Sequence, residues 1–266
     1  MVRFNLSCVR WLCLLLAASG SLAWSANLVS NGDFETNGGL GQISGGISSA
    51  AGWTSGTPTD ATYAFNFIVN GNADSLGFPS VNSASMGTNI YVWGPNTPGT
   101  KGGPSSNGFT SSPNGGYFMG MDGGYATAAV SQTINGLTQG DDYTLSFEYA
   151  FSQFTDQVGA TTQSIQVNFG SQQTSTPSYN LPGKGFSGWS TYSYTFTASL
   201  NSQTLSFLAI GPYGLPPFAL LDNVVLEAAT TPPPPPGVPE PASLSLAALG
   251  ACAVFGRYRR LKARQK

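Results

Sequence analysis

The sequence predicts an all-β protein, a β-sandwich of about ten short strands held between two apolar ends. Three observations predict it. Apolar and polar residues alternate through the middle of the chain, as in "YTLSFEYAF" at 143–151, where Tyr, Leu and Phe share one face and Thr, Ser, Glu and Ala share the other. Gly, Pro, Asn and Ser separate such runs, as turns do. The helical period of 3.6 residues is almost absent between residues 27 and 227.

The expected strands are runs of this kind bounded by turn residues. In chain order they are 27–35, 63–69, 89–93, 116–122, 127–134, 143–151, 163–169, 191–197, 203–210 and 219–227. The last run is apolar almost throughout, so we expect it to be buried on both faces. No sequence repeat of fixed period is visible, which argues against a solenoid.

Residues 94–116 interrupt this pattern. They contain seven Gly and four Pro in 23 positions. A loop of that length inside a compact domain is usually functional or disordered. We expect this one to be disordered.

Charge and composition exclude several classes of function. Between residues 27 and 231, only Lys101 and Lys184 oppose eleven carboxylates, a net charge of −9. Such a domain is not expected to bind nucleic acid, because that requires Lys and Arg to neutralise phosphates. His is absent, and the three Cys lie in the terminal segments at 8, 13 and 252. The middle of the chain therefore has no disulfide, no thiolate metal site and no His-based catalysis.

The N-terminus has the order of a secretory signal peptide. Basic residues precede an apolar run, which ends in small residues. We expect a signal helix in residues 1–23 with cleavage after Ala23, or alternatively after Ala26. An uncleaved anchor helix is the other interpretation, but the apolar run is shorter than a membrane span.

The C-terminus consists of three parts. Residues 230–237 form a Pro-rich linker, which we expect to be extended. Residues 238–266 then contain a Pro239, Glu240, Pro241 box, an apolar run at about 242–256 that predicts a short transmembrane helix, and a basic tail at 257–266. Its cations are Arg257, Arg259, Arg260, Lys262, Arg264 and Lys266. Positive charge keeps that end in the cytoplasm, so the domain before it is expected outside.

This ending resembles the PEP-CTERM sorting signal of Gram-negative bacteria, in which a Pro-Glu-Pro box precedes a transmembrane helix and an Arg-rich tail. The resemblance implies recognition by an exosortase, which removes the tail near the box. The protein would then be anchored transiently in the inner membrane before reaching the cell surface or the extracellular matrix. A plain tail anchor is the alternative.

The middle of the chain is similar to galactose-binding-like jelly-roll domains, the fold of several carbohydrate-binding modules. The phrases that carry the similarity are "NLVSNGDFE", "SPNGGYFMGMDG", "AAVSQTINGLTQGDDYTLSFEYAF" and "FALLDNVVLE", in that order. The similarity implies a jelly-roll β-sandwich over 27–229 and a glycan, such as an extracellular polysaccharide, as the ligand.

The same similarity implies a structural calcium between the first and last strands. The matching carboxylates are Glu35 and Asp222, with Asn31 and Asp33 as further oxygen donors. The alternative is that Asn31 and Asp33 form an Asx turn and that Asp222 caps a loop.

Glycan binding would use aromatic side chains in loops, because their faces pack against the CH side of a pyranose. Trp53, Trp93 and Trp189 are the first candidates, and the sequence also places Tyr91, Phe154 and Tyr213 in or beside loops. The hydroxyl row Thr191, Ser193, Thr195 and Thr197 could contact ice or simply be a solvated strand face.

An enzyme is not expected. Asp141 and Asp142 are adjacent in "TQGDDY", which is typical of a hairpin turn, and no nucleophile elbow, phosphate loop or dinucleotide motif is present. We therefore expect an adhesive, glycan-binding module at the cell surface or in the matrix of a biofilm. A purely structural matrix protein without a soluble ligand is the first alternative, and a polysaccharide-active enzyme is the second.

Overall fold

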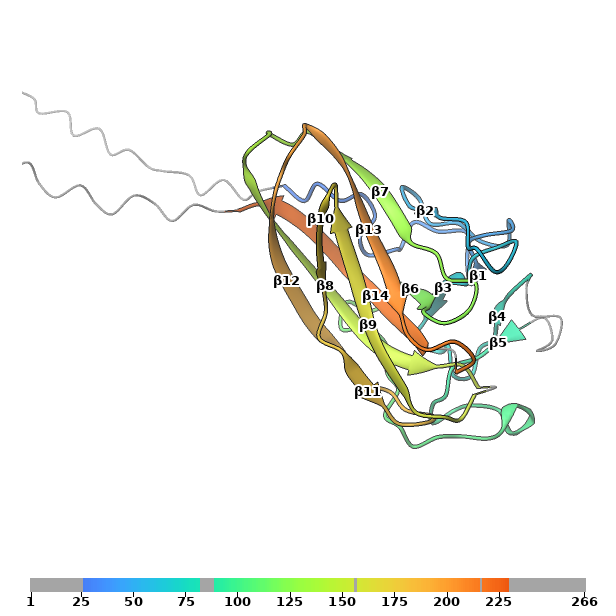
Figure 1. The fold of residues 1–266 in the computed structure, drawn as a ribbon. Helices are drawn as coiled ribbons and strands as arrows, with labels where there is room; N and C mark the ends of the chain where they lie inside the picture. The colour runs from blue at the N-terminus through green and yellow to red at the C-terminus, as the bar shows by residue number, and fades with distance from the viewer. Residues whose placement is uncertain (1–25, 82–88, 156, 216, 230–266) are drawn as a thin grey trace, which may run out of the picture. The chain divides into compact units, whose positions relative to one another are not determined.

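The computed structural model describes residues 26–81, 89–155, 157–215 and 217–229 (Figure 1). The expected signal peptide, Pro-rich linker and sorting signal lie outside these residues. The chain divides into two compact units, Met1–Ala228 and Ala229–Lys266, and the account below concerns the first. Within the described ranges, no helix is long and apolar enough to cross a membrane.

The described residues form an all-β sandwich, as the sequence predicts. One sheet has the strand order β1-β3-β6-β14-β8-β12 and is antiparallel throughout. Its strands are β1 (Gly41–Gln42), β3 (Asn66–Asn70), β6 (Tyr117–Asp122), β8 (Asp142–Gln153), β12 (Ser190–Thr197) and β14 (Pro217–Ala228).

The second sheet lies over the first (Figure 1) and has the order β10-β9-β13-β7-β2, with β11 paired to β9. Its strands are β2 (Thr54–Ser55), β7 (Val130–Asn135), β9 (Thr161–Phe169), β10 (Gln172–Ser175), β11 (Tyr179–Leu181) and β13 (Ser202–Ile210). Two short strands, β4 (Phe78–Pro79) and β5 (Asn89–Ile90), pair separately, and Gly99–Lys101 forms a single 3₁₀ turn, η1.

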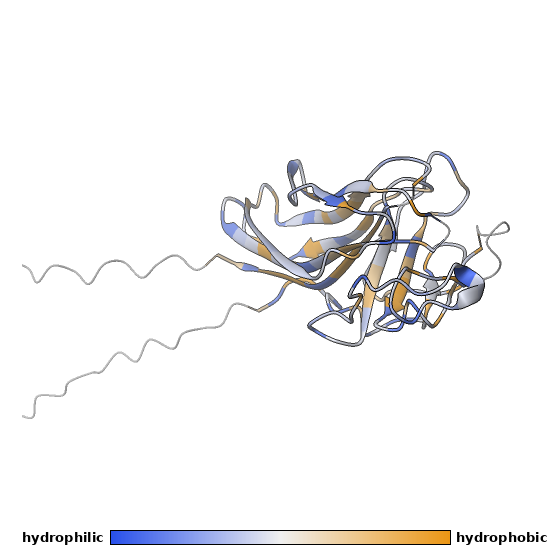
Figure 2. Ribbon diagram, turned by 90° about the horizontal axis from the view of Figure 1, so that it is seen from below, coloured by the Kyte–Doolittle hydropathy of each residue, from blue (hydrophilic) through white to orange (hydrophobic). Residues whose placement is uncertain are grey.

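The main core lies between the two sheets. Alternate residues of β8 and β9 point into it, including Leu145, Phe147, Val167 and Phe169. Figure 2 shows hydrophobic residues along the strands, while the loops are mainly hydrophilic or intermediate. Burial of these side chains is the main favourable term in folding.

A second core lies on the opposite face of the first sheet. It is formed by the residues of β3, β6 and β14 that alternate along each strand with those of the main core. Among them are Phe67, Phe118, Phe218 and Leu220. Because successive side chains on a strand point to opposite faces, these strands are buried on both sides. This confirms the expectation of burial on both faces for 219–222, whereas Asn223, Val225 and Glu227 are only partly buried. Loops carrying residues such as Phe78 and Phe109 cover the second core.

The expectation that residues 94–116 are disordered is wrong. Asn107 Nδ2 donates hydrogen bonds to the carbonyl oxygens of Trp93 at 2.8 Å and Lys184 at 3.0 Å, and Phe109 is buried in the second core. The Gly and Pro content correctly excludes strands here, but it does not prevent a loop from packing.

Two expected strands are also corrected. Residues 27–35 form turns, because Asn31 and Phe34 adopt φ of 50° and 54°, which no strand allows. The run 89–93 is a strand only at Asn89–Ile90. The turn containing Asp141 joins β7 of one sheet to β8 of the other, so it is not a hairpin.

Candidate functional site

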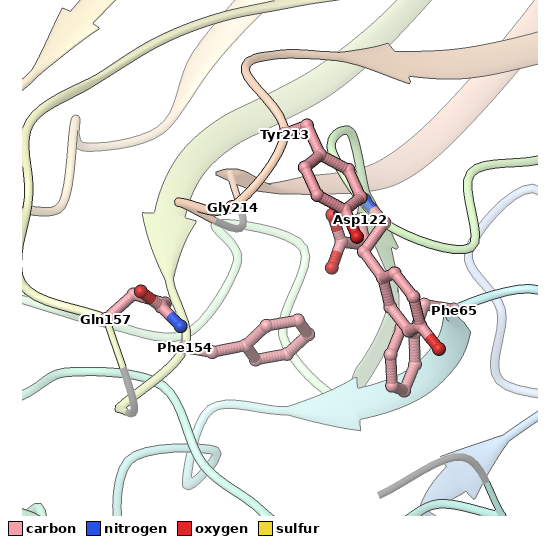
Figure 3. A pocket seen from close by; sticks show the side chains of 7 residues that line it. Phe65, Asp122, Phe154, Gln157, Tyr213 and Gly214 are labelled. Carbon is pink, nitrogen blue, oxygen red and sulfur yellow. Dashed lines mark hydrogen bonds between the residues drawn. The ribbon is translucent and has the colours of Figure 1, made fainter. Parts of the chain in front are cut away.

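A pocket opens where β6 and β8 end and β14 begins (Figure 3). Its volume is about 160 Å³. It is lined by Phe65, Asp122, Tyr125, Phe154, Gln157, Tyr213 and Gly214, and we call it the Asp122 pocket.

Strand pairing brings these distant residues together. Phe218 of β14 lies opposite Asp122 on one neighbouring strand and Ser152 on the other, so the ends of β6 and β8 meet beside the start of β14. The Asp122 N–H donates to the Phe65 carbonyl oxygen at 2.9 Å, which fixes Phe65 at the same end of the sandwich. The pocket is therefore formed at the ends of paired strands by the residues and loops that adjoin them.

Aromatic rings form most of its wall. The ring of Tyr125 lies 5.3 Å from that of Phe65 and 6.5 Å from that of Tyr213, between ring centroids. Phe65 in turn lies 6.1 Å from Phe154. Tyr213 is 75 % exposed, so its ring stands at the mouth of the pocket and is open to a ligand.

Two glycines in the turn after β6 allow the loop that carries Tyr213 to pack closely against that turn. They follow Asp122 in the sequence "MDGGY". A Cβ atom on Gly123 would lie 2.9 Å from the carbonyl carbon of Ile210, and one on Gly124 would lie 2.5 Å from the carbonyl oxygen of Pro212. Only glycine leaves room for this contact without a shift of the backbone.

Asp122 is the one charged residue in the lining, and it is only 1 % exposed. Its Oδ1 accepts hydrogen bonds from the backbone N–H groups of Gly124 at 2.7 Å and Tyr125 at 3.0 Å. Its Oδ2 is buried and has no hydrogen-bond partner among the described residues. In Figure 3 the carboxyl group lies between Tyr213 and Phe65, on the side facing Phe154.

The surroundings of Asp122 favour its neutral form. Burial raises the pKa of Asp122 from 3.8 to about 7, and the nearby negative charge of Asp60 adds to the rise. The two backbone hydrogen bonds oppose it. A buried acid with one unsatisfied oxygen in an aromatic pocket is a strong acceptor for a ligand group that can donate a hydrogen bond or carry positive charge.

The structure places the three expected Trp residues elsewhere. Trp53 is 7 % exposed and belongs to the main core, where its Nε1 donates to the Asn31 carbonyl oxygen at 2.9 Å. Trp93 is 1 % exposed, and Lys184 Nζ lies 4.2 Å from its ring centroid. Their ring faces are covered, which corrects the expectation that they contact a glycan.

Trp189 is partly buried and packs its ring against Phe118 at 5.2 Å. It does not line the Asp122 pocket. The pocket instead contains Phe154 and Tyr213, which the sequence placed in or beside loops, and Phe65, Asp122 and Tyr125, which it did not single out. The signal for Asp122 was an acid followed by two glycines and an aromatic residue.

The residues expected to bind calcium lie on two neighbouring segments, which are joined by a hydrogen bond of 2.9 Å from the Val224 N–H to the Gly32 carbonyl oxygen. Asn31 and Asp33 organise the first turn: Asn31 Nδ2 donates to the carbonyl oxygens of Thr36 and Ala51, its Oδ1 accepts from the Thr36 N–H, and Asp33 Oδ1 accepts from the Glu35 N–H. The bond between Asp33 and Glu35 is that of an Asx turn, whereas the bonds of Asn31 reach five or more residues along the chain.

Asp222 belongs to the other segment and lies opposite Glu148 of β8. Its Oδ2 is buried without a partner among the described residues, and burial raises its pKa from 3.8 to about 7, with the nearby Glu148 and Glu35 adding to the rise. Glu35 Oε1 accepts a hydrogen bond from the Tyr117 N–H at 2.6 Å, and Glu148 Oε2 accepts one from Ser112 at 3.2 Å.

Calcium takes six to eight oxygen ligands. In the part of the chain that the structure describes, no three carboxylates, His or Cys are grouped so that they could hold a metal ion. Glu35 lies near enough to Asp222 to act on it electrostatically, whereas the side chains of Asn31 and Asp33 are engaged in hydrogen bonds of the first turn. Calcium binding at these residues stays a prediction. Burial of Asp222 and the negative charges of Glu148 and Glu35 favour the protonated form of its carboxyl group.

Comparison with known proteins gives a limited match. A family model described as a protein of unknown function, DUF642, matches residues 100–216, which is less than half of the chain. No curated protein matches.

Several of the solved structures that match are described as carbohydrate-binding modules, and another is the enzymatically active domain of the bacteriophage CBA120 tailspike protein 4. TmCBM61 in complex with β-1,4-galactotriose is 11 % identical over 77 % of this chain and 100 % of that one, with a TM-score of 0.38. The CBM22-1-GH10 modules of Clostridium thermocellum xylanase 10B, complexed with xylohexaose, are 10 % identical over 77 % and 29 %, with a TM-score of 0.35. The C-terminal CBM6 of LamC from Zobellia galactanivorans is 13 % identical over 44 % and 83 %, with a TM-score of 0.29.

Proposed function

We propose that the protein is a glycan-binding module and that the Asp122 pocket holds one sugar unit. The observation that carries this proposal is the combination of aromatic walls with a buried, half-satisfied carboxyl group. Aromatic faces such as that of Tyr213 pack against the apolar face of a pyranose, and a carboxyl group binds its hydroxyls. Both features are needed to hold and orient a sugar.

The size of the pocket favours a chain end. At about 160 Å³ it is smaller than the roughly 300–1,000 Å³ of sites for drug-sized ligands. A terminal sugar would enter it, while the rest of the glycan would remain in solvent near the exposed Tyr213.

Binding, rather than hydrolysis, is the activity we propose for this pocket. Glycosidases use two carboxyl groups placed on either side of the bond that is cut. The lining of the Asp122 pocket contains one acid.

Export and sorting are a further part of the proposal, and the sequence alone supports them. The signal-peptide pattern at 1–23 and the PEP-CTERM pattern at 238–266 would deliver the sandwich to the cell surface or matrix through an exosortase. Mass spectrometry of the mature protein from its bacterial host tests this. A chain starting at Trp24 or Asn27 and ending near the Pro239–Pro241 box is expected, and an intact 266-residue chain would contradict it.

The binding activity is tested with the purified full-length chain in mild detergent on an array of neutral, acidic and amine-bearing glycans. Binding to at least one class is expected, in the millimolar to micromolar range. If no glycan binds while deletion of the protein weakens the cohesion of the matrix, the purely structural role is correct instead.

A further inference from the structure

The carboxyl group of Asp122 indicates which chemical class of ligand the pocket would bind. Asp122 lines an aromatic pocket, and its buried Oδ2 has no partner among the described residues, although a buried carboxylate is costly unless it is paired. The chain offers few cations to pair with it. Between residues 27 and 231 the cations are Lys101 and Lys184, whose Nζ atoms lie over the rings of Tyr91 at 5.4 Å and Trp93 at 4.2 Å, and neither residue lines the pocket.

We propose that the Asp122 pocket binds an organic ammonium group, so that its preferred glycan ends in a sugar with a free amine. This inference rests on the glycan-binding function proposed above. It names the chemical class of the ligand that this function would recognise.

The aromatic rings that line the pocket can bind a cation as well as pack against a sugar ring. Ammonium groups are attracted to the faces of aromatic rings, and most strongly where water is excluded. Tyr125, Phe65, Tyr213 and Phe154 form a chain of neighbouring rings around the pocket that Asp122 faces. Rings and a carboxylate together form a site for an ammonium ion.

Charge disfavours the other classes of sugar. An acidic sugar would approach a domain of net charge −9 and two carboxylates, Asp122 and Asp60. A neutral sugar could donate a hydrogen bond to Asp122 Oδ2, but it has no positive charge with which to stabilise the ionised carboxylate. An amine both donates and balances the charge.

The expected protonation of Asp122 agrees with binding of an ammonium group. The titratable groups around Asp122 are Asp60, Tyr125 and Tyr213, and none of them supplies positive charge. Because burial raises the pKa of Asp122 to about 7, the carboxyl group takes up a proton near neutral pH when no cation is present. An ammonium ligand would replace that proton.

The experiment compares ligands that differ in this charge. The full-length chain is titrated at pH 7 by calorimetry with chitotetraose in its fully deacetylated form and in its fully N-acetylated form. We expect the deacetylated form to bind at least about tenfold more tightly. The Asp122→Asn variant should reduce this ratio to near one, while Asp141→Asn, which removes the same charge from an exposed turn, should leave it unchanged.

The outcomes separate the two proposals. Equal affinity for the two forms in the wild-type chain would overturn the ammonium inference and leave the glycan function in place. Tetramethylammonium serves as a third probe. If tetramethylammonium binds to the wild-type chain but not to Asp122→Asn, and no glycan binds, the ammonium site is correct and the glycan function is wrong. If neither a sugar nor tetramethylammonium binds to the folded protein, both proposals are wrong. The melting temperature of each variant shows that it is folded.

Discussion

Gly124 packs so closely against Pro212 that a Cβ atom on Gly124 would lie 2.5 Å from the Pro212 carbonyl oxygen. This contact joins the turn after β6, which holds Asp122, to the loop that carries Tyr213. Together with the contact between Gly123 and Ile210, it helps to position the acid and the exposed ring of the Asp122 pocket.

A methyl group at this position should separate the two loops. We expect Gly124→Ala to lower the free energy of unfolding by about 1–3 kcal/mol, which is typical of overpacking, and to weaken ligand binding. Gly99→Ala is the control, because a Cβ atom there meets nothing within 4 Å. Urea denaturation and calorimetry measure the two effects, and equal behaviour of the variants would show that the contact does not shape the pocket.

Asp122 should lower the stability of the fold at neutral pH. Its pKa is about 7 when folded and about 3.8 in the unfolded chain, so the folded state binds more protons between these values. The free energy of unfolding should therefore fall as pH rises from about 4 to about 7. A difference of three pKa units corresponds to on the order of 4 kcal/mol.

The Asp122→Asn variant removes this effect. Relative to wild type, its gain in the free energy of unfolding should be several kcal/mol larger at pH 8 than at pH 4, as measured by urea denaturation at both values. Asp141→Asn again serves as the control. A gain that does not depend on pH would mean that Asp122 is not held in its protonated form by burial.

Ligand binding should show the complementary dependence on pH. Tetramethylammonium keeps its charge at every pH, so its affinity reports the ionisation of the pocket alone. We expect this affinity to rise as pH increases through about 7, because a cation binds the ionised form of Asp122, and to level off above it. A flat profile in the wild-type chain, like that expected for Asp122→Asn, would contradict this.

Removal of metal ions tests the calcium site that the sequence predicts. If calcium binds Glu35 and Asp222, the melting temperature in EDTA should lie several degrees below that in excess calcium, because the cation stabilises the two nearby carboxylates. Asp222→Ala should abolish this difference. Equal melting temperatures in EDTA and in excess calcium would contradict the predicted site.

The sequence predicts the strands well where alternation is strong. Tyr143–Phe151 lies within β8 and the run 219–227 within β14. The apolar character of the latter correctly indicates burial on both faces for 219–222, beyond which every second residue is only partly buried. The sequence wrongly predicts a strand at residues 27–35, because the apolar residues Leu28, Val29 and Phe34 are typical of a strand. Their backbone is set by the side chain of Asn31 and by positive φ, which alternation does not encode.

The pocket was harder to predict because its residues come from four separate segments. Phe65, Asp122, Phe154 and Tyr213 meet only through the strand order β3-β6-β14-β8, which the sequence does not specify. The sequence also could not show which aromatic residues are covered by other segments of the chain. Trp93 and Tyr213 both follow strand-like runs, but the loop of 94–116 packs beside Trp93, whereas Tyr213 remains exposed.

The most direct test of the central claim, that the Asp122 pocket is the glycan site, is to measure the affinity of the full-length chain for its best array ligand after removal of one exposed ring. Tyr213→Ala removes the ring at the mouth of the pocket, and Tyr194→Ala removes an exposed ring of β12. We predict that Tyr213→Ala raises the dissociation constant about tenfold or more while Tyr194→Ala leaves it unchanged. An unchanged constant in folded Tyr213→Ala would contradict the claim.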